Sequence, residues 1–147
     1  MDWYCPFEEI EIGTGRKLKD GKNTAILTVG PIGNDAAKAI EEAEAERPGT
    51  SIAHYDMRFI KPLDENLLHE IGKKFARIMT VENGVRSGGF GSAVLEWLQD
   101  HGYNTRVTRL GMPDEFVEHG TVAELHKIVG IDKDNIKRRV LELCDAQ

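Results

Sequence analysis

Residues 24–49 read TAILTVGPIGNDAAKAIEEAEAERPG, a short apolar run followed by a longer helical pattern. The apolar run ends at Gly30 and Pro31, and the Ala- and Glu-rich pattern stops at Pro48 and Gly49. This stretch therefore predicts a strand over residues 24–29 and a helix over about residues 34–46.

The same alternation continues along the chain. Further strands are expected at residues 50–56, 77–81 and 105–110, with a helix in each gap between them. Asp64 is a candidate cap for the first of these helices. Thr121 and Glu124 have the Thr-x-x-Glu form of a capping box, which predicts a helix ending near Val129. A last helix is expected over residues 133–144.

Strands separated by helices of this length predict right-handed crossovers and a mainly parallel sheet covered by helices on both faces. The expected class is a three-layer α/β fold, and 147 residues are enough for one domain spanning 1–147. An imperfect alternation from Phe7 to Ile12 indicates that residues 1–23 form a linker or a further edge strand, which could be antiparallel. The pattern leaves the strand order open.

The composition indicates which kinds of partner to exclude and which cellular compartment to expect. A formal charge of −6 repels a phosphate backbone, so no nucleic acid is expected as a partner. No apolar run is long enough to span a bilayer, and the first residues do not resemble a signal peptide, so no membrane partner is expected either. The two cysteines, Cys5 and Cys144, form no disulfide framework, which favours a reducing, cytoplasmic setting.

Candidate functional residues follow the expected strands, because ligands of open α/β sheets bind at the carboxyl ends of the strands. Arg58 and Glu82 each follow such a strand, and we hypothesise that they form an ion pair. The glycine-rich turn before the next helix could offer backbone N–H groups to an anion, or could serve close helix packing or contact with another domain. Its candidate residues are Gly88, Gly89, Gly91 and Ser92.

Other recognisable sites are excluded by pattern. The turn lacks the third glycine of a dinucleotide fingerprint, and no phosphate-binding P-loop occurs. The five histidines show no zinc-binding spacing, and no nucleophile elbow surrounds Ser87 or Ser92. His119, in the non-periodic stretch 111–120, is kept as a candidate contact, although a histidine that braces the loop is the simpler interpretation. No catalytic, cofactor-binding or metal-binding residue is expected in this chain.

Three segments together resemble one family. They are DMRFIKPLD at residues 56–64, VENGVRSGGFG at residues 81–91 and GMPDEFVEHG at residues 111–120. Their order and spacing resemble those in the third, carboxy-terminal domain of the 1-deoxy-D-xylulose-5-phosphate synthase family. The members of this family are transketolase-type thiamine-diphosphate enzymes. Transketolases and the β subunits of 2-oxo acid dehydrogenases share a looser version of the second segment, so their equivalent domains remain alternatives. A free-standing anion-binding interaction module is a further one.

The resemblance implies a five-stranded mixed sheet with one antiparallel strand, in a fragment of a three-domain enzyme. That enzyme condenses pyruvate with glyceraldehyde 3-phosphate, releases carbon dioxide and supplies the precursor of isoprenoids, thiamine and pyridoxal. Its cofactors, thiamine diphosphate and Mg²⁺, are held by the preceding domains, so the resemblance predicts an inactive fragment without a cofactor. The role it implies for this chain is structural: packing on the remaining domains and supporting a homodimer.

Overall fold

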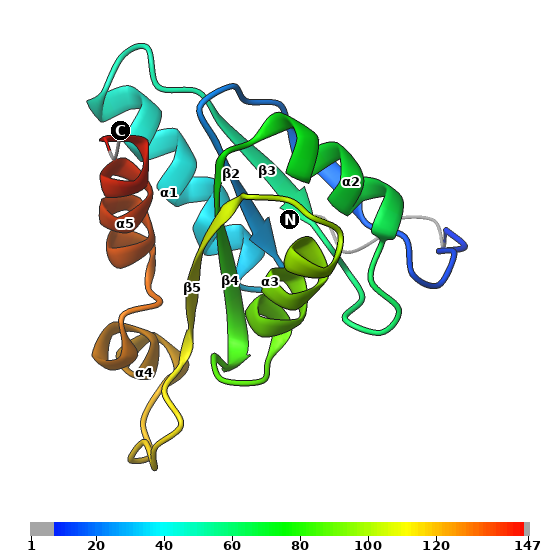
Figure 1. Ribbon diagram of the computed structural model, residues 1–147. Helices are drawn as coiled ribbons and strands as arrows, with labels where there is room; N and C mark the ends of the chain where they lie inside the picture. Colours follow the sequence, from blue (N-terminus) through cyan, green and yellow to red (C-terminus); the bar gives the residue numbers. More distant parts are fainter. Residues whose placement is uncertain (1–7, 146–147) are drawn as a thin grey trace.

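The structure is a computed structural model that describes residues 8–145. Within this range five strands and five helices alternate along most of the chain (Figure 1). The strands are β1 (Arg16–Lys19), β2 (Thr24–Thr28), β3 (Ile52–Asp56), β4 (Arg77–Val85) and β5 (Arg106–Met112). The helices are α1 (Gly33–Glu46), α2 (Glu65–Lys74), α3 (Phe90–Asp100), α4 (Val122–Val129) and α5 (Lys133–Asp145).

The strands form one sheet in the order β1-β3-β2-β4-β5. Strands β2 to β5 are parallel, whereas β1 runs antiparallel to β3, with Arg16 opposite Asp56. The expected three-layer α/β class with one antiparallel strand is confirmed. The edge strand lies later than the alternation indicated, because residues 8–11 are not in a strand and a turn from Glu11 to Thr14 precedes β1. Cys5 and Phe7 lie outside the described residues.

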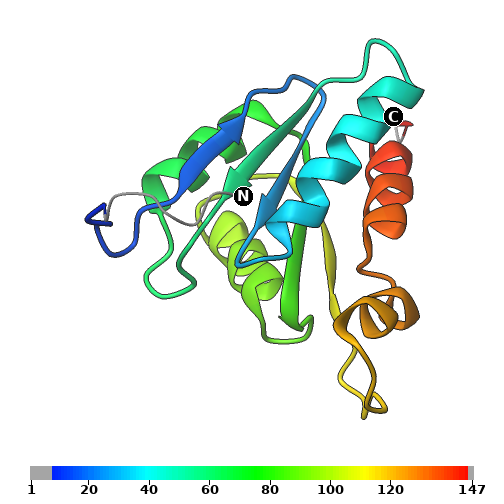
Figure 2. The same ribbon diagram turned by 180° about the vertical axis from the view of Figure 1, so that it is seen from behind.

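Helices cover both faces of the sheet, as Figures 1 and 2 show from opposite sides. Helices α1 and α5 pack on one face, and α2 and α3 pack on the other. Because successive side chains of a strand point to opposite faces, β2 sends Ile26 into the first core and Ala25 and Leu27 into the second. Burial on both sides explains why every residue of the central strand β2 is buried, rather than every second one. No helix within residues 8–145 combines the length and the apolar character that a membrane crossing requires.

The two predicted helix caps are present. The Asp64 carboxylate accepts a hydrogen bond from Leu67 N at 2.9 Å, and its other oxygen accepts one from Gly15 N at 2.8 Å. Asp64 therefore begins α2 and also fastens the segment before β1 to the loop after β3. At α4 the Thr121 hydroxyl and the Glu124 carboxylate form both bonds of the capping box.

Helix α4 differs from the other four helices because none of its residues is buried. It is nevertheless apolar at several positions, and Val122 and Ile128 are exposed. The chain continues from α4 into α5, where Ile136, Val140 and Leu143 are buried as their spacing predicts. Val129 packs against the first core, whereas the apolar side chains of Val122 and Ile128 are left exposed and are available for contact with another surface.

Candidate functional site at the carboxyl edge of the sheet

The carboxyl ends of the four parallel strands meet at one edge of the sheet, at the bottom of Figure 1. Four loops extend from this edge: residues 29–32 after β2, residues 57–64 after β3, residues 86–89 after β4 and residues 113–121 after β5. All the candidate residues except Glu82, Gly91 and Ser92 lie in these loops, and those three lie in the adjoining ends of β4 and α3. The edge is therefore where a site on this fold is expected.

Glu82 is the buried acid of this edge, with 2% of its surface exposed. Its carboxylate oxygens accept hydrogen bonds from Phe90 N and Gly91 N, each at 2.8 Å. These N–H groups belong to the first turn of α3, where the helix dipole also favours a negative charge. Glu82 is thus an internal anion that joins β4 to the start of α3 through two charge-assisted hydrogen bonds.

Three glycines make room for this carboxylate. A Cβ atom at Gly89 would lie 2.3 Å from Glu82 Oε2 and 2.2 Å from the carbonyl oxygen of Val85. At Gly84 a Cβ atom would lie 2.9 Å from the same carboxylate oxygen, and at Gly111 it would lie 3.0 Å from Glu82 Cγ. Within the turn this close approach explains Gly89 alone. Gly88 has a positive φ of 74°, and a Cβ atom at Gly91 would lie 2.5 Å from Thr80 Oγ1. An external anion at the turn would have to use groups other than Phe90 N and Gly91 N.

Ser92 braces the same turn. Its hydroxyl donates to the carbonyl oxygen of Arg86 at 3.1 Å and accepts from Gly88 N at 3.0 Å. It also accepts from the guanidinium of Arg109, at 2.6 Å. The single hydroxyl proton and the acceptor lone pairs are therefore in use, so Ser92 holds the loop after β4 against β5.

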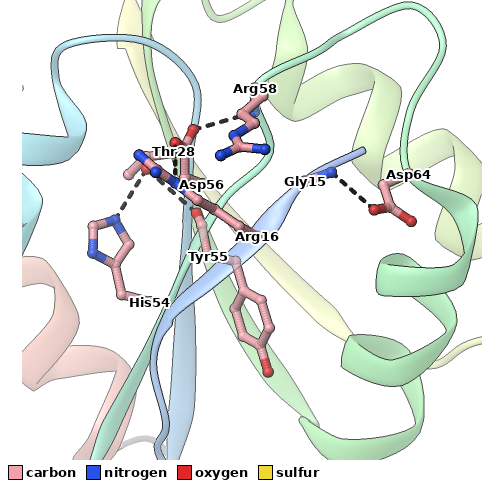
Figure 3. A network of polar contacts seen from close by, with 8 residues as sticks. All are labelled: Gly15, Arg16, Thr28, His54, Tyr55, Asp56, Arg58 and Asp64. Carbon is pink, nitrogen blue, oxygen red and sulfur yellow. Dashed lines mark hydrogen bonds and ion pairs between the residues drawn. The ribbon is translucent and has the colours of Figure 1, made fainter. Parts of the chain in front are cut away.

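Arg58 has a left-handed backbone conformation, with φ of 56°. It is the one non-glycine residue with positive φ in the part of the chain that the structure describes. Its N–H donates to Asp56 Oδ1 at 3.2 Å, and the other oxygen of Asp56 accepts from Arg16 Nε at 3.1 Å (Figure 3). Such a conformation costs about 1 to 2 kcal/mol in a residue with a side chain. Asp56 provides part of the compensation.

The hypothesised ion pair between Arg58 and Glu82 is wrong: within residues 8–145, no ion pair of 4.0 Å or less joins them. The reason is the strand order. Strand β2 lies between β3 and β4, so the ends of the two flanking strands are roughly 10 Å apart. The Glu82 carboxylate is also turned toward α3. His119 is exposed in the loop before α4, and no hydrogen bond of the described residues joins it to Arg58, Glu82 or Ser92.

Sequence reasoning assigned no role to His54, which is 2% exposed in β3. Its Nε2 lies 3.0 Å from Thr28 Oγ1 on the neighbouring strand, and the Thr28 hydroxyl lies 3.3 Å from the carbonyl oxygen of Tyr55 (Figure 3). Because the hydroxyl donates to that carbonyl, the ring nitrogen donates to the hydroxyl oxygen. Burial lowers the pKa of His54 to about 4, with Asp56 opposing the shift and Lys19 adding to it. The sequence signal that could have indicated a buried histidine is the apolar run around it in β3, where Ile52, Ala53 and Tyr55 are buried.

Three adjoining hollows cross the carboxyl edge. The largest, of about 480 Å³, is lined by the loop after β5 and by Ile128 and Val129 of α4. The second, of about 270 Å³, lies between Val85 and Phe116, and the third, of about 340 Å³, lies between Ile60 and the glycine-rich turn. Within residues 8–145 no group of three or more His, Cys, Asp or Glu side chains is placed to hold a metal ion.

Comparison with known proteins identifies relatives for the whole domain. Residues 13–136 match the family model described as "Transketolase, C-terminal domain". The chain is 57% identical to the 1-deoxy-D-xylulose-5-phosphate synthase of Bacteroides thetaiotaomicron, over 99% of this chain and 22% of that protein. It is 42% identical to the synthase of Geobacillus thermodenitrificans, over 90% of this chain and 21% of that protein. The chain therefore spans about a fifth of the length of these relatives.

Solved structures agree with this grouping. The chain resembles one titled "Split gene transketolase, inactive beta4 tetramer", with a TM-score of 0.81 and 31% identity. That match covers 95% of this chain and 45% of the other. A transketolase from Campylobacter jejuni has a TM-score of 0.63 at 15% identity, over 92% of this chain and 19% of that one, and shows the shared fold alone.

Proposed function

Because this chain belongs to the transketolase C-terminal domain family, we propose that it is the C-terminal domain of a 1-deoxy-D-xylulose-5-phosphate synthase. The near-complete match to the Bacteroides thetaiotaomicron synthase, at 57% identity, carries this proposal. The whole enzyme condenses pyruvate with glyceraldehyde 3-phosphate and releases carbon dioxide. The lower identity of 31% to the split-gene transketolase makes a transketolase the weaker alternative.

The role of this domain is structural. The polar groups that the sequence places at the carboxyl edge bind one another: Glu82 holds the start of α3, and Ser92 holds the loop after β4. These contacts stabilise the loops at the edge and leave their outer surfaces for the other domains of the enzyme. Arg58, Gly88 and His119 are candidate contacts on those surfaces. The same observation disfavours a free-standing anion-binding module, because Glu82 fills the anion position of the turn.

Thiamine diphosphate and Mg²⁺ belong to the rest of the enzyme in this proposal. The described residues do not fit the cofactor, since the N–H groups that could receive a phosphate at the start of α3 already bind Glu82. They also hold no cluster of three potential metal ligands. The enzyme as a whole is expected to be a cytoplasmic homodimer.

A domain exchange tests the proposal. This chain replaces the corresponding C-terminal region of the Bacteroides thetaiotaomicron synthase, and the formation of 1-deoxy-D-xylulose-5-phosphate is measured against the parent and against the parent lacking that region. We expect the exchanged enzyme to be active and the truncated one to be inactive. A folded exchanged enzyme that binds thiamine diphosphate without making product would refute the proposal. Calorimetry of the isolated chain with thiamine diphosphate and Mg²⁺ is expected to show no binding.

A further inference from the structure

Four large apolar side chains are exposed along the carboxyl edge. Phe116 is fully exposed, Ile128 is 74% exposed, and Val85 and Ile60 are 42% and 40% exposed. They are contiguous: Ile60 and Val85 line one hollow, Val85 and Phe116 line the next, and Phe116 and Ile128 line the third. We call these four residues the apolar strip. An exposed apolar surface that runs across three loops and a helix is typical of an interaction site.

The chain enters the domain beside one end of this strip. Gly13 packs so closely on Pro62 that a Cβ atom there would lie 2.8 Å from Pro62 Cγ. Gly15 N is bound to Asp64 at 2.8 Å. Both partners lie in the loop after β3, which also carries Ile60. The segment that leads into β1 therefore lies at the carboxyl edge. This chain covers 22% of the Bacteroides thetaiotaomicron relative.

The rim of the strip is mainly acidic around Phe116, whereas the exposed Lys61 and Lys127 adjoin Ile60 and Ile128 in the sequence. Asp114, Glu115 and Glu118 lie in the loop around Phe116, and Arg86 is the basic residue that shares a hollow with them. A partner protein surface that covers Phe116 and Ile128 brings its own side chains close to these three carboxylates. Basic side chains at its rim would be attracted, and further acids would be repelled.

We propose that the preceding domains of the same enzyme dock on the apolar strip, through an apolar patch that places basic residues opposite the acidic loop around Phe116. This inference rests on the proposed function and adds the contact surface and the chemistry of the partner. Docking then buries the side chains of helix α4 that are exposed in the isolated domain. The loop after β5 and α4 act together as the contact element, with Phe116 at its centre.

Hydroxyl-radical footprinting tests the inference on the isolated chain and on the active domain-exchanged enzyme. We expect oxidation of Phe116 and Ile128 to fall by about five-fold or more in the enzyme, because docking removes both from solvent. Leu18, which is 46% exposed on β1, is the internal control and should be labelled equally in both. Equal labelling of Phe116 and Ile128 in an active enzyme would overturn the docking surface while the proposed function stands. An inactive exchanged enzyme would count against the proposed function itself.

Two variants of this chain separate docking from folding. Phe116→Ser and Ile128→Gln change exposed side chains, so the isolated chain should melt as before. The same changes should weaken association of this chain with the separately expressed preceding domains by about ten-fold, as truncation of an interface anchor does. Leu18→Ser is the matched control and should have no effect. If the isolated chain instead forms dimers that Phe116→Ser disrupts, a second copy occupies the strip and the proposal is wrong.

Discussion

Lowering the pH from 7.5 to 5 should destabilise the domain through one buried histidine. His54 lies in the middle of β3, hydrogen-bonded to Thr28 on β2, with 2% of its surface exposed. Burial holds its pKa at about 4, whereas an unfolded chain has the ordinary value of 6.5. Between these values the unfolded chain binds a proton at His54 and the folded domain does not. The contribution is therefore complete above pH 6.5 and is lost progressively as the pH falls toward 4.

The magnitude follows from the two pKa values. Through His54, the free energy of unfolding is about 2 kcal/mol lower at pH 5 than at pH 7.5. The decrease reaches about 3 kcal/mol below pH 4. A loss of this size is a substantial part of the total stability of an ordinary domain. Asp56 and Lys19 act on His54 in opposite directions, so burial decides the sign.

Urea unfolding followed by circular dichroism, at half-unit steps from pH 7.5 to 4.5, measures this contribution. His54→Gln keeps a side-chain N–H donor for Thr28 and removes the titration. The difference in free energy of unfolding between wild type and this variant should shift by about 2 kcal/mol in favour of the variant between pH 7.5 and 5. His119→Gln changes an exposed histidine and should follow the wild type. A His54→Gln variant that loses stability in parallel with the wild type would refute the reasoning.

Three further outcomes are expected. Glu82→Gln removes the charge and replaces one of the two acceptor oxygens at the start of α3 by an NH2 group, which cannot accept from the N–H that faces it. The change should cost about 1.5 to 3 kcal/mol in urea unfolding, whereas Glu118→Gln, in the exposed loop, should cost nothing measurable. Gly89→Ala forces a Cβ atom against the Glu82 carboxylate and the Val85 carbonyl, so it should destabilise the domain by about 2 kcal/mol or more. An unchanged unfolding midpoint would contradict the close approach of Gly89 to Glu82. Thr121→Ala removes the capping box and should speed amide hydrogen exchange in residues 122–129 by about five-fold, while global stability changes little because no α4 residue is buried.

Much of the candidate site could be named from the sequence, because its residues stand where expected strands end. Glu82, Gly89, Gly91 and Ser92 all contribute to one braced turn. Their mutual contacts were not predictable, since the Glu82 carboxylate meets N–H groups eight and nine residues away only after β4 and α3 have packed. Arg58 and Glu82 were expected to meet, and the intervening strand β2 separates them. No role was predicted for His54, because its hydrogen-bond partner Thr28 lies in another strand.

The sequence by itself determined most of the elements, although β4 runs to Val85 instead of ending at residue 81, and β1 lies at Arg16–Lys19, after the alternation that indicated it. The apolar runs, the Pro48 and Gly49 stop, the Asp64 cap and the Thr121 capping box depend on interactions between residues three or four positions apart. The tertiary structure alone decided the order β1-β3-β2-β4-β5. It thereby decided that Gly111 makes room for Glu82, that His54 is buried neutral and that Ile60, Val85, Phe116 and Ile128 form one strip. These contacts join residues far apart in the chain, and the alternation of strands and helices is compatible with several strand orders that would place different side chains together.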